Sequence, residues 1–192
     1  MANLITIDEF KTYKGINSET DDTIISLLIG NVTSFIKEYT GRYLIDYAHT
    51  DKVEYFDGTD YPLYFPNEFP LISVTELATS TDGGVTYTAL VENTDYFVDL
   101  EEDALVNNTA LTGFVTSSIK HKSCRVTYKA GYTTAPHALQ QAALDMVEYY
   151  RKEEHAISKS MQSAHVENPV IILNGSQLPA HIKRVLDLYR VL

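Results

Sequence analysis

Residues that could do chemistry are present in this sequence, but their spacing does not form a recognisable site. No two of the six histidines stand four residues apart, and the chain has a single cysteine. A structural zinc site needs four such ligands at short, fixed spacings, so no zinc site is expected. The sequence Glu153-Glu154-His155 looks like part of a metal site, but the solvated end of a helix explains it better. The histidines are His49, His121, His137, His155, His165 and His181.

Three other candidate motifs also favour structural interpretations. The acidic run from Asp99 to Asp103 lacks the alternating ligands and central glycine of a calcium loop, so an exposed turn is expected there. Gly83-Gly84 is not followed by the Lys-Ser/Thr pair of a phosphate loop. Cys124 lies in a predicted strand, where a buried and inert thiol is expected. The sequence therefore predicts no catalytic, cofactor-binding or metal-ligating residues, and no enzyme.

The charge balance excludes several classes of partner. The chain has 192 residues with 15 basic and 26 acidic side chains, a net charge of -11. Such a chain is poorly suited to neutralising DNA phosphates or binding anionic membranes. No apolar run approaches the length needed to cross a bilayer, and the N-terminal residues do not resemble a secretion signal. We therefore expect a protein made in a reducing cytosol, with no membrane partner.

Two helices are predicted at the N-terminus. Thr6 and Glu9 form a capping-box pattern that opens a short helix, which continues to about Lys14. A longer helix is predicted within Ser18–Arg42, capped by Ser18 and ended by Gly41. The expected inner faces are Ile7, Phe10 and Tyr13 in the first helix, and Ile24, Ile25, Leu28, Val32, Phe35, Ile36 and Tyr39 in the second.

Two more helices are predicted near the C-terminus. Pro136 opens one helix whose inner face is Leu139, Ala143, Met146, Val147 and Tyr150. Leu178-Pro179 opens a last helix that faces inward through Ile182, Val185, Leu186 and Tyr189 and runs nearly to Leu192. Between these helices, Val170 to Leu173 is a possible strand.

The middle of the chain alternates apolar and polar residues with the period of strands. About six short strands are expected in an antiparallel sheet or sandwich, around Val53–Tyr55, Ile72–Leu77, Val85–Tyr87, Asp95–Asp99, Ala104–Val106 and Arg125–Tyr128. The predicted fold class is α+β. Residues 1–50 and 133–192 should form one small helical bundle, into which residues 51–132 are inserted as a β-rich part.

The order of these features resembles the bacteriophage head–tail connector family of adaptor, or head-completion, proteins, in its long form. The resemblance is carried by Ile5 to Lys14, Asp21-Asp22 through Tyr39-Thr40-Gly41-Arg42, Val126 to Tyr132, Pro136 to Tyr150, and Pro179 to Arg190. These stretches cover somewhat under half of the chain.

The resemblance implies a structural virion protein of the head–tail junction with no cofactor and no catalytic role. Members form a ring, commonly dodecameric, that binds the portal protein at the capsid vertex and extends the DNA channel. The ring also receives a stopper or tail-completion protein. DNA passes through such a channel without specific binding, which suits an acidic chain.

Two sets of residues are candidate contact sites. One is an acidic lumen or rim, which would use Glu19, Asp21, Asp22, Glu101, Glu102 and Asp103. The other is a contact with the portal or another partner, made by Ile182, Val185, Tyr189, Arg190 and Leu192 of the last helix and tail; packing on the chain's own bundle explains these residues equally well.

Three alternatives remain open at this point. The first is another neck or tail-completion ring. The second is a β-sandwich recognition module that binds a glycan or receptor through Tyr55, Tyr61, Tyr64 and Tyr87. The third is a cell-wall hydrolase attached to a neck protein.

Overall fold

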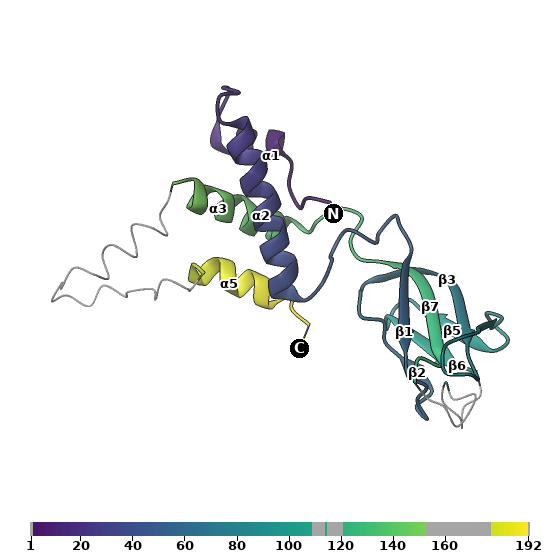
Figure 1. Ribbon diagram of the computed structural model, residues 1–192. Coiled ribbons are helices and arrows are strands. Elements are labelled where there is room, and N and C mark those ends of the chain that lie inside the picture. The colour runs from purple at the N-terminus through teal and green to yellow at the C-terminus, as the bar shows by residue number, and fades with distance from the viewer. Residues whose placement is uncertain (1, 109–113, 115–120, 153–177, 192) are drawn as a thin grey trace. The chain divides into compact units, whose positions relative to one another are not determined.

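The computed structural model describes residues 2–108, 114, 121–152 and 178–191. Its contacts divide the chain into two compact units (Figure 1). The helical unit combines Met1–Arg42 with Ala135–Leu192, and the β unit is Tyr43–Thr134. Among the described residues, the helical unit contains α1 (Ile7–Lys14), α2 (Asp22–Thr40), α3 (His137–Arg151) and α5 (Ala180–Asp187). The fold class is α+β, with helices at both ends of the chain and strands between them, as the sequence predicts.

Helix α1 begins with the predicted capping box. The Thr6 Oγ1 accepts a hydrogen bond from the Glu9 N–H at 3.2 Å, and the Glu9 carboxylate accepts one from the Thr6 N–H at 2.6 Å. Phe10 is fully buried, as predicted. Tyr13 differs from the prediction because its side chain is 41% exposed and its hydroxyl donates to Asp145 of α3 at 2.9 Å.

Helix α2 ends where predicted but starts later. Gly41 adopts a left-handed conformation with φ of 69°, which glycine reaches without steric cost. The predicted cap at Ser18 is wrong, because the Ser18 Oγ instead accepts from the Thr20 N–H within a turn. The N-cap residue is Asp21, whose side chain makes no capping bond.

The buried face of α2 is rotated from the predicted one. Ile25, Ile29, Val32 and Ile36 are all buried, whereas Ile24 is 58% exposed. The predicted stripe merged this face with its apolar neighbours Ile24, Leu28, Phe35 and Tyr39, of which the last three are half-buried. A helix with apolar residues on more than one side does not by itself reveal which side is covered.

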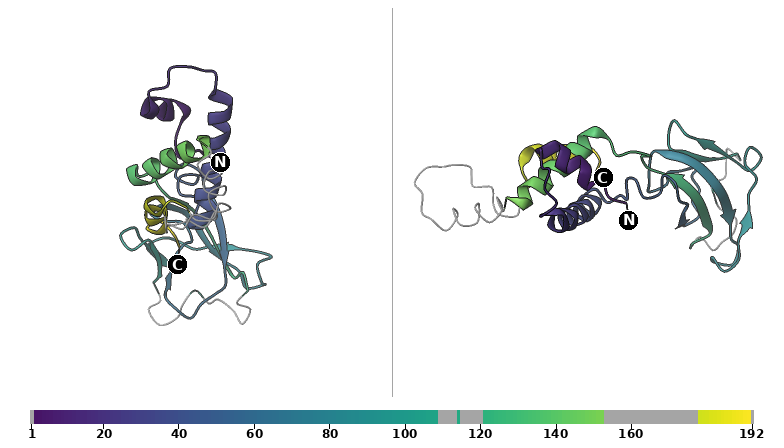
Figure 2. Two further views of the ribbon diagram at one scale, coloured as in Figure 1. Left: turned by 90° about the vertical axis from the view of Figure 1, so that its left-hand side faces the viewer. Right: turned by 90° about the horizontal axis from the view of Figure 1, so that it is seen from above.

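The C-terminal helices complete the bundle. Helix α2 packs against α3 and α5, and α3 packs against α5 (Figures 1 and 2). The buried residues of α3 include the predicted Leu139, Ala143, Met146 and Val147. Helix α5 buries Ile182 and Leu186 but ends at Asp187, earlier than predicted. The possible strand at residues 170–173 lies outside the described residues.

The β unit contains two antiparallel sheets (Figure 1). One has the order β1-β7-β3-β4, formed by Lys52–Phe56, Cys124–Ala130, Leu71–Thr79 and Thr88–Ala89. The other has the order β2-β6-β5, formed by Leu63–Tyr64, Ala104–Asn107 and Tyr96–Asp99. The alternation in β7 buries Val126, Tyr128 and Ala130 on one face, as predicted. These side chains join a core with Leu71, Leu77, Tyr96, Leu105, Phe114 and Cys124.

Two strands of the β unit differ from the sequence-based expectation. The expected return strand at Val85–Tyr87 is absent, and β4 begins at Thr88. The Asp82 carboxylate accepts from the N–H groups of Val85 and Thr86, at 3.1 and 2.9 Å, so those groups bond within the loop. The sequence analysis predicts no strand at β2, because prolines flank it. An edge strand nevertheless tolerates flanking prolines.

The two ends of the β unit are fastened to each other. The Tyr132 N–H donates to the Leu44 carbonyl at 2.8 Å, and the Ala130 N–H donates to the Tyr47 carbonyl at 3.1 Å. Gly131 has φ of 99°, and a Cβ atom there would lie 2.2 Å from the Leu44 oxygen. Only glycine allows the two segments to approach this closely.

The burial pattern of α2 gives a direct test of the bundle. Replacing Ile36 by alanine should lower the free energy of unfolding by about 2–5 kcal/mol, because it leaves a cavity in the core. Replacing Leu27, which is 64% exposed on the same helix, should change it by less than about 0.5 kcal/mol. Urea denaturation followed by circular dichroism measures both, and equal costs would contradict the buried face assigned here.

Candidate interaction surfaces

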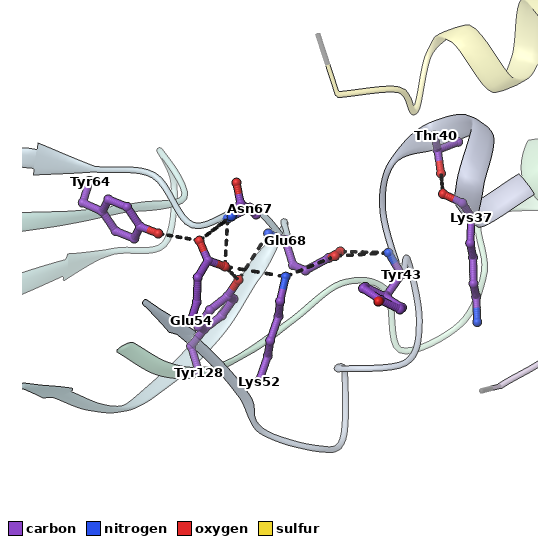
Figure 3. Close-up of polar contacts among 9 residues, drawn as sticks. All are labelled: Lys37, Thr40, Tyr43, Lys52, Glu54, Tyr64, Asn67, Glu68 and Tyr128. Carbon is purple, nitrogen blue, oxygen red and sulfur yellow. Dashed lines mark hydrogen bonds and ion pairs between the residues drawn. The ribbon is translucent and has the colours of Figure 1, made fainter. Parts of the chain in front are cut away.

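In the described part of the β unit, the Glu54 carboxylate is the centre of a group of polar contacts (Figure 3). It accepts hydrogen bonds from the Tyr128 hydroxyl at 2.6 Å, from the Tyr64 hydroxyl, and from the Asn67 side-chain amide at 2.6 Å. Strand β1 directs Glu54 inward, β7 supplies Tyr128, and β2 supplies Tyr64. One buried carboxylate therefore joins strands of both sheets.

Lys52 links this carboxylate to a second one. Its ammonium group lies 3.5 Å from Glu54 and 3.4 Å from Glu68 (Figure 3). Glu68 also accepts from the Tyr43 N–H, at 3.1 and 3.2 Å to its two oxygens. We call Lys52, Glu54, Tyr64, Asn67, Glu68 and Tyr128 the Glu54 cluster.

The Glu54 cluster is a structural clamp. Burial, followed by the bond to Glu54, raises the pKa of both Tyr64 and Tyr128 well above the usual value near 10, so both remain hydroxyl donors at neutral pH. Each carboxylate is held by several donors and turned away from solvent. Sequence analysis missed the cluster, because the strand predicted at Val53–Tyr55 begins one residue after Lys52. In β1, Lys52 and Glu54 alternate with exposed residues and therefore share the inner face.

The other candidates for chemistry are dispersed. Within the described ranges, no three His, Cys, Asp or Glu side chains converge so that they could hold a metal ion, and no helix is long and apolar enough to span a membrane. Cys124 is fully buried, and burial raises its pKa to about 11, as expected for an inert thiol. The candidate Glu153-Glu154-His155 lies outside the described residues.

The residues proposed for a C-terminal contact divide into two groups. Ile182 is buried in the helical unit and Val185 is half-buried, so these two face their own bundle. Arg190 lies 5.7 Å above the Tyr39 ring, and the Val191 N–H donates to the Thr40 carbonyl at 3.0 Å. The tail is thus fixed at the C-terminal end of α2. Tyr189 is half-buried, and Leu192 lies outside the described residues.

The six acidic candidates also differ in their surroundings. Asp22 forms an ion pair with Lys11 at 3.0 Å, and Asp103 accepts from the Leu71 N–H at 2.6 Å. Both therefore have structural partners. The other four, which are Glu19, Asp21, Glu101 and Glu102, are exposed.

Acidic charge is concentrated in the β unit. Residues 43–134 contain 14 of the 26 acidic residues but only 5 of the 15 basic ones. From Asp82 to Asp103 there are seven acidic residues and no lysine or arginine. This stretch includes the β5–β6 hairpin, whose tip exposes Glu101 and Glu102. The helical unit, by comparison, has nearly equal numbers of acidic and basic residues.

The tyrosines suggested as a ligand platform are not equivalent. Tyr55 and Tyr87 lie together, with ring centroids 6.0 Å apart, and Arg125 lies 4.8 Å from the Tyr87 ring. Tyr64, in contrast, is stacked on Phe56 and donates to Glu54. Because Tyr64 belongs to the Glu54 cluster, the four tyrosines do not form one exposed surface.

The Glu54 cluster can be tested by removing one hydroxyl. Tyr128→Phe should lower the free energy of unfolding by about 1–3 kcal/mol at pH 7, because Glu54 loses a buried donor. The exposed Tyr55→Phe is the matched control and should change stability little. Urea unfolding measures both variants.

The same variant should also respond less to alkali. The raised pKa means that the unfolded chain loses the tyrosine proton first, so wild-type stability falls as pH rises above about 10. Removing one such hydroxyl should make that fall shallower. An identical pH dependence in both proteins would contradict the assignment.

The reactivity of Cys124 provides a probe of the β unit. A buried thiol with a pKa near 11 should react with a maleimide at pH 7 only when the unit opens, so labelling should be at least about a hundredfold slower than in urea. Mass spectrometry at timed intervals measures this rate. Rapid labelling of the folded protein would show that Cys124 is accessible.

Comparison with solved structures identifies proteins with a similar fold. Two similar structures are the neck of an empty gene transfer agent particle computed with C6 symmetry and the neck of a native particle computed with C12 symmetry. The first has 12% identity and a TM-score of 0.61, covering 98% of this chain and 90% of the other. The second has 14% identity and a TM-score of 0.59, covering 100% and 96%. At these identities the likeness concerns the fold.

Family membership rests on the sequence. Among curated proteins no sequence matches this chain. The family model for head completion proteins, however, matches residues 3–192. The chain therefore belongs to the head completion protein family, and it is a structural protein of the phage virion at the head–tail junction rather than an enzyme.

Proposed function

We propose that this chain forms the adaptor ring of a phage neck, which binds the portal protein at the capsid vertex and joins head to tail. The match of the head completion family over residues 3–192 carries this proposal. The fold supports it, because the similar neck structures were computed with C6 and C12 symmetry. A ring of twelve copies is the arrangement we adopt, with a stopper or tail-completion protein as the next component.

The charge distribution suggests how the wall of the ring interacts with DNA that passes through it. A channel must let the phosphate backbone slide, and a negative wall repels phosphates instead of holding them. We assign the rim or lumen to the acidic β5–β6 hairpin, through the exposed Glu101 and Glu102. Asp22 and Asp103 are less suited, because they already form an ion pair and a backbone hydrogen bond.

The end of the chain is the segment we assign to the portal contact. Val191 is 43% exposed beside the last turn of α2, and Leu192 follows it. Ile182 belongs to the core of the helical unit, so it stabilises the helix that carries the tail. We also propose that the two ends of the chain form one helical bundle and that the β-rich part is inserted between them.

Assembly on the portal tests the proposal. Purified protein mixed with the portal protein of the same phage should give rings on the portal in negative-stain images. Val191→Asp combined with Leu192→Asp should reduce bound protein by at least about tenfold, because apolar contacts at the tail are lost. Val85→Asp is the control, since Val85 is 80% exposed in the β unit.

The outcomes separate the two parts of the proposal. Rings that form equally well with the altered tail would reject the portal contact at residues 191–192. A folded protein that never associates with portal, tail proteins or itself would reject the adaptor function.

A further inference from the structure

The solvent-facing side of α2 is unusually poor in charge. Seven residues of this helix are exposed, and only Glu38 among them is charged. In α5, by comparison, three of the five exposed residues are charged. Ile24 and Leu27 are 58% and 64% exposed on this side of α2. Depletion of charge around exposed apolar side chains is typical of a surface that another protein covers.

The exposed residues of α2 are regularly spaced. Ile24, Leu27, Asn31, Ser34 and Glu38 follow one another at steps of three, four, three and four residues. We call them the outer stripe of α2. This is the spacing of a seam along which a second helix packs, and the small Ser34 permits close approach.

Helix α5 and its C-cap carry a second stripe with the same spacing. His181, Arg184 and Leu188 are separated by three and four residues and are all exposed, Leu188 by 77%. We call them the outer stripe of α5. Arg184 lies on the opposite side of the helix from Ile182 and Leu186, which face the bundle.

The two stripes are complementary. The outer stripe of α2 has two exposed large apolar side chains, Ile24 and Leu27, and that of α5 has one, Leu188. The charged residue is Glu38 on α2 and Arg184 on α5. Within one copy, α5 already packs against α2. The residues of the outer stripe of α2 stay exposed in this copy, so they can contact an α5 that belongs to another molecule.

We infer that the outer stripe of α2 binds the outer stripe of α5 of a second copy of this chain. Two different surfaces meet in such a contact, so every copy has one of each and the contact repeats until the ring closes. This inference rests on the proposed ring, and it identifies which surfaces join neighbouring copies. The tail at residues 191–192 is left for the portal.

Cross-linking between engineered cysteines tests the contact. Leu27→Cys and Leu188→Cys place one thiol on each stripe, and the native Cys124 is buried and does not compete. With a short bismaleimide, rings of the double variant on portal should yield a ladder of products well beyond the dimer. A mixture of the two single variants should stop at a dimer. Val85→Cys paired with Leu188→Cys is the matched control and should give no product.

A second measurement does not depend on cross-linking geometry. Leu27→Ser and Arg184→Glu should each reduce the yield of rings by about tenfold while leaving the urea midpoint unchanged, because both side chains are exposed. Val85→Ser should leave the yield unchanged. Equal ring yields for all three variants would overturn the contact.

The results distinguish this inference from the function on which it rests. Dimers between two Leu27→Cys chains would show a symmetric contact, and products between Leu188→Cys and portal would show that portal covers α5. Either result overturns the inference while leaving the adaptor ring intact. A folded wild-type protein that forms no rings with portal would instead reject the adaptor function itself.

Discussion

The apolar face of α2 has to be covered by helices that the chain supplies only after the whole β unit. Ile25, Ile29, Val32 and Ile36 are buried against α3 and α5, which follow in sequence after a segment of more than ninety residues. Helix α1 also packs against α2, but with eight residues it is too short to cover the length of a helix of 19 residues. The helical unit is therefore held together by contacts between the two ends of the chain.

Polar groups are arranged differently in the two units. In the β unit a half-buried lysine lies between two buried glutamates. The hydroxyls of Tyr64 and Tyr128 donate to one of these carboxylates, that of Glu54. Breaking such a cluster is costly because an uncompensated charge would stay buried. In the helical unit the buried charged side chains are Lys37, Arg42 and Glu148. Glu148 forms ion pairs with Lys14, Arg151 and Lys152, at 3.8, 3.0 and 3.0 Å.

Much of the fold could be predicted from the sequence, and the errors have physical causes. The Thr6–Glu9 capping box, the stop at Gly41 and the alternation in β7 are local signals, and the structure confirms them. Three features could not be predicted from local pattern: the start of α2, its buried face and the loop at Val85. They depend on side-chain hydrogen bonds or on which side of a helix its neighbours cover. The sequence pattern placed the buried Ile182 among the candidate contact residues and omitted the exposed Leu188, because both are apolar and lie on the same short segment.

The close pairing of residues 44–47 with 130–132 has a consequence for how this chain could have arisen. A segment whose first and last residues lie side by side can be placed in the loop of a host protein without pushing the host's own elements apart. The glycine at 131 fixes that juxtaposition within the segment itself. The β unit thus has the properties of a transferable module, which related chains could gain, lose or exchange while retaining the same helices.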